Sequence, residues 1–87
     1  MARVFLARSA RDALADLDFL LADAVLDALG ELERNPEAGY ELRGRLTGLW
    51  SYRVGVYGII YERRDRNTLR VVAIRHRGQA YDTDPRG

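Results

Sequence analysis

Arginine side chains recur in two segments of the second half of the chain where they could bind an anion. Arg53 lies within the segment 50–54, and Arg75 and Arg77 flank His76, the only histidine. Side chains two residues apart share one face of a strand, so Arg75 and Arg77 would project together. The guanidinium fork matches the geometry of phosphate oxygens. The pattern favours a polyanionic partner; the alternative is that these arginines only form the solvated face of an exposed sheet.

Charge is divided unevenly along the chain. Residues 1–39 carry 4 arginines and 8 acidic residues, whereas residues 40–87 carry 10 arginines and 5 acidic residues, for a net charge of +1. Every basic residue is arginine, a bias that a GC-rich coding sequence would also produce. The segregation of charge is therefore better evidence for an anionic partner than the use of arginine itself.

Several classes of protein are excluded by what the 87 residues lack. Without cysteine there is no disulfide framework and no cysteine-based zinc site or nucleophile. One histidine and no acidic cluster on the basic strands leave too few ligands for metal catalysis, and no glycine-rich phosphate loop follows a strand. We therefore expect no metal and no cofactor. The absence of an apolar run of roughly 18 residues and of a signal peptide predicts a cytoplasmic protein without membrane contact.

The first half of the chain predicts one strand and two helices. Residues 3–6 are apolar and β-prone, and Ser9 is a candidate helix N-cap with an acid three residues later. Apolar residues then recur with helical spacing up to Leu32. This stripe is long for one helix, so we expect a break within 18–23, with Asp23 capping a second helix. The segment 34–39 contains a proline and should end the second helix.

The second half predicts three strands, over 46–54, 56–63 and 69–77, joined by a turn at Gly55 and a hairpin loop at 64–67. Short connections imply antiparallel pairing. We therefore predict an α+β fold: a small antiparallel sheet in the order β-α-α-β-β-β, with a helical hairpin packed on one face and the other face open. Residues 1–87 should form a single domain, with a mobile tail at 82–87.

Alternation within these strands assigns side chains to the two faces. It predicts that Leu46, Trp50, Tyr52 and Val54 share one face, and that Leu49, Ser51 and Arg53 share the other. It also places Tyr57, Ile59 and Tyr61 together, and Val72, Ile74 and His76 on the face opposite Val71, Arg75 and Arg77. The aromatic residues of these strands are interpreted as core rather than as platforms for stacking bases.

The chain resembles the RelE/ParE superfamily of bacterial toxins from toxin–antitoxin pairs. The resemblance rests on the order and spacing of segments 42–55, 57–62 and 74–77 and of Tyr81, and it covers nearly the whole chain. It implies an antiparallel sheet with a helical hairpin and a small antitoxin that neutralises the toxin. RelE-like members cleave mRNA in the ribosomal A site, whereas ParE-like members inhibit DNA gyrase.

The resemblance also implies roles for individual residues in a metal-independent endoribonuclease. Arg53 and Arg77 would contact the scissile phosphate, and Tyr81 would act as a base or stack on a nucleotide; alternatively, Tyr81 only packs the C-terminus. His76 is a candidate for proton transfer, although its predicted face favours a structural role. The remaining candidates for RNA contact are Arg43, Arg45 and Arg75, which are otherwise surface charges.

Gly58 departs from the family pattern, which has an arginine within Tyr-Arg-aliphatic-aliphatic-Tyr. Loss of one electrostatic donor to a transition state can lower a rate by about 10²–10³-fold. We therefore expect a ribosome-dependent mRNA endonuclease that is attenuated or inactive, unless Arg75 compensates for the missing arginine or the glycine was introduced so that the protein could be produced. The alternatives are a ParE-like gyrase inhibitor and a degenerate toxin that only binds antitoxin. Expected partners are an antitoxin, with a hetero-tetramer or larger complex, and the ribosome with its mRNA.

Overall fold

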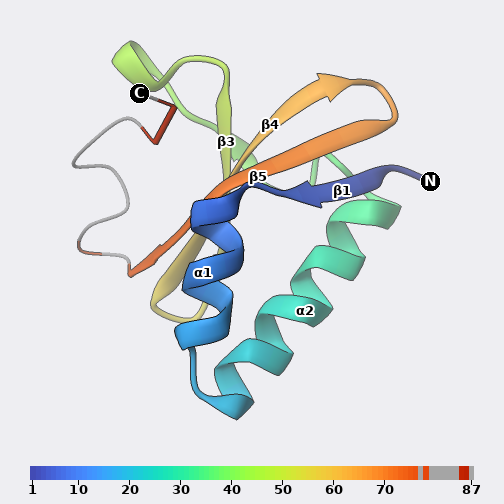
Figure 1. The fold of residues 1–87 in the computed structure, drawn as a ribbon. Helices are drawn as coiled ribbons and strands as arrows, with labels where there is room; N and C mark the ends of the chain where they lie inside the picture. The colour runs from blue at the N-terminus through green and yellow to red at the C-terminus, as the bar shows by residue number, and fades with distance from the viewer. Residues whose placement is uncertain (77, 79–84, 87) are drawn as a thin grey trace.

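The protein folds as two helices packed on one face of a five-stranded sheet (Figure 1). The computed structural model describes residues 1–76, 78 and 85–86. The α+β class and the helical hairpin on one face are confirmed. The elements are β1 (Arg3–Leu6), α1 (Arg8–Asp16), α2 (Phe19–Arg34), β2 (Tyr40–Glu41), the 3₁₀ turn η1 (Gly44–Leu46), β3 (Leu49–Val54), β4 (Tyr57–Asp65) and β5 (Thr68–His76).

The strands lie in the order β1-β5-β4-β3-β2. Pairing from β5 through β2 is antiparallel, as the short connections predict, and the turn at Gly55 has the positive φ of 59° that favours glycine. Two features differ from the prediction. The short strand β2 was missed, and β1 pairs in parallel with β5 because the chain crosses over through both helices before it re-enters the sheet.

The start of α1 differs from its predicted capping. The N-cap residue is Ala7, and no side chain caps the helix. Ser9, the predicted cap, lies inside the helix, and its hydroxyl donates a hydrogen bond of 2.9 Å to the carbonyl oxygen of Val72 in β5. Ser9 therefore fastens α1 to the sheet instead of satisfying the helix N-terminus.

The predicted break between the helices is confirmed, but its cap was assigned to the wrong residue. Leu17 has an extended backbone, and Asp18 caps α2 by accepting a 3.0 Å hydrogen bond from the backbone N–H of Leu21. Asp23 lies within the first two turns of α2 and is exposed. Both positions carry a residue type that caps helices, and only the backbone geometry at Leu17 distinguishes them.

The main core lies between the helices and the sheet. Its buried members come from both layers: Ala2, Ala10, Val25, Ala28, Leu29, Leu32, Ile59, Tyr61, Leu69, Val71 and Ile74. Trp50, Tyr52 and Tyr57 pack against it, which confirms that these aromatic residues belong to the core side. Tyr61 is fully buried, and its hydroxyl donates a 3.0 Å hydrogen bond to the carbonyl oxygen of Pro36. Burial raises the pKa of Tyr61 above the ordinary value of 10.0.

The opposite face of the sheet, called the open face below, is less open than predicted. A second cluster of buried residues covers its middle: Leu46, Leu49, Ile60, Val72 and Ala73. Leu46 was predicted to share the face of Trp50 within a strand. That prediction is wrong because Leu46 belongs to η1, which folds back over the open face.

A β-bulge in β5 exchanges the predicted faces of Val71 and Val72. Tyr61 pairs with Val71 and Ile60 with Ala73, so Val72 has no direct partner. Val71 therefore faces the helices and Val72 the open face. Beyond the bulge the predicted alternation holds, with Ile74 in the main core and Arg75 opposite.

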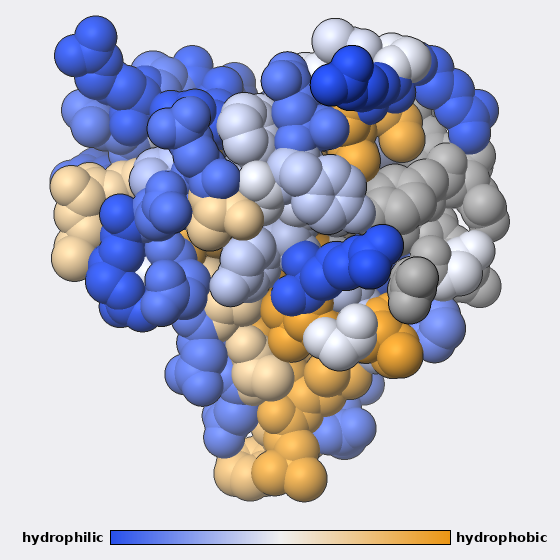
Figure 2. All heavy atoms as spheres, turned by 180° about the vertical axis from the view of Figure 1, so that it is seen from behind, coloured by the Kyte–Doolittle hydropathy of each residue, from blue (hydrophilic) through white to orange (hydrophobic). Residues whose placement is uncertain are grey.

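Large apolar side chains are exposed where α1 and α2 meet. Phe19 and Leu20, at the start of α2, are each 76% exposed, and Leu26, in the middle of α2, is 52% exposed. Figure 2 shows hydrophobic side chains gathered at this lower end of the molecule. No helix within the described part of the chain is both long enough and apolar enough to span a membrane.

Candidate functional site

A row of three residues crosses β3, β4 and β5 on the open face. Arg53 pairs with Gly58, and Gly58 pairs with Arg75. Directly paired residues project to the same face, and neighbouring strands are spaced about 4.8 Å apart, so the Cα atoms of the two arginines lie about 10 Å apart. Arg53 is exposed and Arg75 is half-buried. This arginine pair (Arg53 and Arg75) can hold two oxygens of one phosphate, or two neighbouring phosphates.

Arg53 is accessible from the edge of the sheet as well as from the open face. Strand β2 pairs with Trp50 and Ser51, and the backbone of Leu42 bonds to Leu49, so β3 is an edge only beyond Ser51. Arg53 lines two shallow hollows there. One, of about 280 Å³, includes Tyr40 and Ser51. The other, of about 240 Å³, lies against α2 and includes two carboxylates, Asp27 and Glu31.

His76 lies on the opposite face from the arginine pair, at the end of β5. It pairs with Tyr57, and the two rings meet edge-on with centroids 5.5 Å apart. Its Nδ1 accepts a 3.3 Å hydrogen bond from the backbone N–H of Gly78. The helix-side orientation agrees with the predicted alternation, but the residue is exposed rather than buried. The sheet therefore separates His76 from a phosphate held by the arginine pair.

The other predicted site residues fall into two groups. Arg43 and Arg45 are exposed in and beside η1, which folds over the open face. Arg77 and Tyr81 lie outside the described residues, so their catalytic roles stay predictions. Of the predicted mobile tail, the structure describes Pro85 and Arg86.

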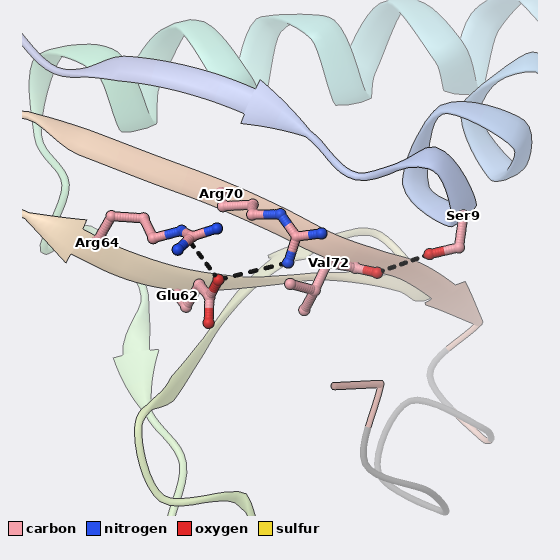
Figure 3. Close-up of polar contacts among 5 residues, drawn as sticks. All are labelled: Ser9, Glu62, Arg64, Arg70 and Val72. Carbon is pink, nitrogen blue, oxygen red and sulfur yellow. Dashed lines mark hydrogen bonds and ion pairs between the residues drawn. The ribbon is translucent and has the colours of Figure 1, made fainter. Parts of the chain in front are cut away.

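A larger hollow of about 520 Å³, called the basic hollow below, lies at the other end of the open face. The charged residues among the described part of its lining are Arg8, Arg64, Arg70, Arg86 and Glu62. Figure 3 shows Arg64 and Arg70 converging on Glu62. The distances to Glu62 Oε1 are 3.3 Å from Arg64 Nε and 3.5 Å from Arg70 Nη1.

Sequence reasoning missed the basic hollow because its residues come from four separate segments. Residues 64–67 were assigned to a hairpin loop, whereas β4 extends to Asp65 and carries Arg64 to the edge of the hollow. The available signal was the pair Glu62 and Arg70, which two hairpin-connected strands bring opposite each other. Within the described ranges, no group of three or more His, Cys, Asp or Glu residues is placed to hold a metal ion.

Comparison with known proteins gives a consistent set of similarities. Residues 4–81 match the sequence profile of the family described as ParE toxin of type II toxin-antitoxin system, parDE. A chain of the RelBE2 toxin–antitoxin complex from Mycobacterium tuberculosis is 33% identical, with a TM-score of 0.79 over 87% of this chain and 91% of that chain. No curated protein sequence matches the chain.

Two further solved structures share the fold. A chain of the archaeal RelE–RelB complex from Pyrococcus horikoshii OT3 is 25% identical, with a TM-score of 0.70 over 91% of this chain and 98% of that chain. The isolated E. coli RelE toxin is 17% identical, with a TM-score of 0.74 over 87% of this chain and 84% of that chain. At that identity, the likeness to the E. coli protein concerns the fold alone.

Proposed function

The chain belongs to the RelE/ParE superfamily of toxins from type II toxin–antitoxin systems, and on this basis we propose that it is a ribosome-dependent mRNA endonuclease. The observation that carries the proposal is the arginine pair on the open face, where Arg53 is exposed, Arg75 is half-buried and the intervening Gly58 is buried. Cleavage of RNA through its 2′-OH concentrates negative charge on the phosphate in the transition state. Two guanidinium groups positioned beforehand stabilise that charge without reorganisation.

Proton transfer in this proposal falls to residues near the C-terminus. The 2′-OH must lose a proton and the 5′-oxygen must gain one. His76 points away from the arginine pair, so it is a poor donor or acceptor for a phosphate bound there. We assign the remaining charge stabilisation to Arg77, and the role of base or stacking platform to Tyr81. As base, Tyr81 takes the proton of the 2′-OH, and the 5′-oxygen takes its proton from water.

Gly58 limits the rate of the proposed reaction. It lies between Arg53 and Arg75, at the position where the family pattern has an arginine. Without a side chain there, the middle of the row supplies no donor to the phosphate. The proposed enzyme is therefore attenuated rather than fully active.

An antitoxin is the proposed protein partner. The similar chains from M. tuberculosis and P. horikoshii were solved in toxin–antitoxin complexes. The exposed apolar residues Phe19, Leu20 and Leu26 at the helical end suit a protein contact, since apolar patches of this kind are often interaction sites. Assembly into a hetero-tetramer or larger complex stays a prediction.

The test is mRNA cleavage in a translating extract, mapped by primer extension. The expected result is cutting within codons in the ribosomal A site, with at least tenfold less cutting by Arg53→Gln. Arg66→Gln provides the matched control because Arg66 is an exposed residue of the turn between β4 and β5 and carries the same charge. If neither the wild-type protein nor Gly58→Arg cuts any mRNA, the proposal is wrong.

Inhibition of DNA gyrase is the second candidate, and two observations favour it. The profile that matches residues 4–81 is that of the ParE toxin, and Gly58 removes a donor that cleavage would use. This candidate predicts blocked supercoiling by purified gyrase while mRNA stays intact. Supercoiling at the normal rate in the presence of excess toxin would exclude it.

A further inference from the structure

Among the described residues that line the basic hollow, positive charge exceeds negative charge. Arg8, Arg64 and Arg70 stand against Glu62, an excess of two charges beside a volume of about 520 Å³. Arg8 forms no ion pair with any described residue. Arg86 reaches the hollow while donating to the carbonyl oxygens of Thr47 at 2.9 Å and Arg45 at 3.1 Å. Such an excess is unfavourable without an anion, so the hollow is suited to receive one.

The ion pairs inside the hollow are easily exchanged. Arg64 and Arg70 share a single oxygen of Glu62, at 3.3 and 3.5 Å, and their side chains are 57% and 40% exposed. Exposed ion pairs contribute only about 0–1 kcal/mol. A phosphate offers several oxygens to both guanidinium groups at once, whereas Glu62 offers them one. Glu62 therefore positions the two arginines without occupying their full bonding capacity.

The first turn of α1 adds a second feature that favours an anion. Ala7, Arg8 and Ser9 line the hollow. No side chain caps this helix, and its first turn has no acidic residue, so its positive end is not compensated locally. The hydrogen bond from Ser9 to Val72 fixes this turn against β5. A rigid, uncapped helix start and the arginines thus face the same space.

We propose that the basic hollow binds a backbone phosphate of single-stranded RNA, at a site separate from the arginine pair. This inference rests on the proposed function, since it takes RNA as the substrate. Arg70 and Arg75 both lie on the open face, five residues apart along β5, which corresponds to about 16 Å. A few nucleotides of extended RNA span that distance. The hollow would hold the strand away from the cleavage point and align it with the arginine pair.

The experiment measures binding of a fluorescent oligouridylate by anisotropy over a series of salt concentrations. The variants are Arg8→Gln and Arg70→Gln, and Arg66→Gln is the control with the same change of net charge. Loss of one phosphate contact should make the slope of log K against log salt shallower by about 0.7, and should weaken binding about fivefold near 0.1 M salt. For Arg66→Gln, the changes in the salt slope and in the affinity should each be at most about half of those for Arg8→Gln and Arg70→Gln.

Three outcomes would overturn the inference. The first is equal effects of all three variants, which would indicate a diffuse field rather than a site. The second is no effect of Arg8→Gln, a change that breaks no ion pair among the described residues. The third is that Arg8→Gln and Arg70→Gln keep the affinity for RNA but lose affinity for polyglutamate. That result would mean that the hollow binds an acidic protein segment.

Failure of the proposed function is distinguishable from failure of this inference. If the wild-type protein cuts no mRNA but binds RNA through Arg8 and Arg70, the phosphate site is supported and only the proposed nuclease activity is wrong. If the wild-type protein cuts mRNA, and Arg8→Gln and Arg70→Gln match it in both cleavage and RNA affinity, the proposed function stands and there is no second phosphate site.

Discussion

Replacing Gly58 by arginine tests the geometry of the open face most directly. The residue lies in an extended strand between Arg53 and Arg75, and its φ is not among the positive values that restrict other glycines of the described chain. An arginine there should project to the open face and complete a row of three guanidinium groups. We expect mRNA cleavage by Gly58→Arg to rise by about 10²–10³-fold, the usual effect of one electrostatic donor to a transition state.

The cost in stability can be worked from the same row. Two new pairs of like charges about 7 Å apart in water repel by about 0.6 kcal/mol each, or about 1.2 kcal/mol in total. Removal of a glycine from a strand interior stabilises the fold by about 0.5–1 kcal/mol. Gly58 is buried, so the arginine must also displace the atoms packed over it, which costs about 1–3 kcal/mol more. The free energy of unfolding of Gly58→Arg should therefore fall by about 1–4 kcal/mol relative to the wild type, as urea denaturation would measure.

Two controls separate charge from backbone effects. Gly58→Ala adds no donor, so it should leave cleavage unchanged. Because Gly58 is buried, the change in the free energy of unfolding shows whether a methyl group fits at this position. Arg53→Gln in the Gly58→Arg background should lose most of the gained activity. Equal cleavage by the alanine and arginine variants would refute the reasoning, because the gain would then come from a stiffer strand.

Three further predictions concern the framework and are measured by urea denaturation. Tyr61→Phe should lower the free energy of unfolding by about 1 kcal/mol, because the partly buried carbonyl of Pro36 loses its donor. Since the pKa of Tyr61 is raised in the folded state, the free energy of unfolding of the wild type should also fall as the pH rises above 10.0, and an equal fall in Tyr61→Phe would contradict this assignment. Asp18→Ala should lower the free energy of unfolding by about 1 kcal/mol, because the N-cap of α2 is lost, and Asp23→Ala should lower it by less than about 0.5 kcal/mol. A larger effect of Asp23→Ala would mean that Asp23 caps α2, as the sequence analysis predicted. Leu32→Ala should lower the free energy of unfolding by about 2–5 kcal/mol, because it leaves a cavity in the main core. A decrease below about 1 kcal/mol would mean that neighbouring side chains move in to fill that cavity.

Local patterns in the sequence predicted the layers of the fold because those layers follow the period of each element. Alternation placed Tyr57, Ile59 and Tyr61 correctly on the helix side, since the backbone of a strand imposes that period. It failed at Val71 and Val72, where a bulge adds one residue to β5. A bulge depends on how two strands pair, and no residue type at this position marks it.

The candidate site was predictable residue by residue but not as an arrangement. Alternation assigned Arg53 and Arg75 to the same face, yet their alignment through Gly58 depends on the register of two hairpins. The basic hollow was out of reach for the same reason, since Arg8 and Arg70 become neighbours only through tertiary packing. The position of each strand relative to its neighbours carries the information that composition and spacing lack.

The parallel pairing of β1 with β5 has a consequence during translation. Residues 3–6 pair with residues 68–71, so the first strand waits for a partner that is synthesised more than sixty residues later. The arginine pair is likewise split between β3 and β5. A nascent chain that has not yet released β5 from the exit tunnel therefore lacks both the closed sheet and the complete anion site. If the protein acts as proposed above, it cannot cleave mRNA on the ribosome that makes it until that strand emerges, and an antitoxin already present can bind it at that moment.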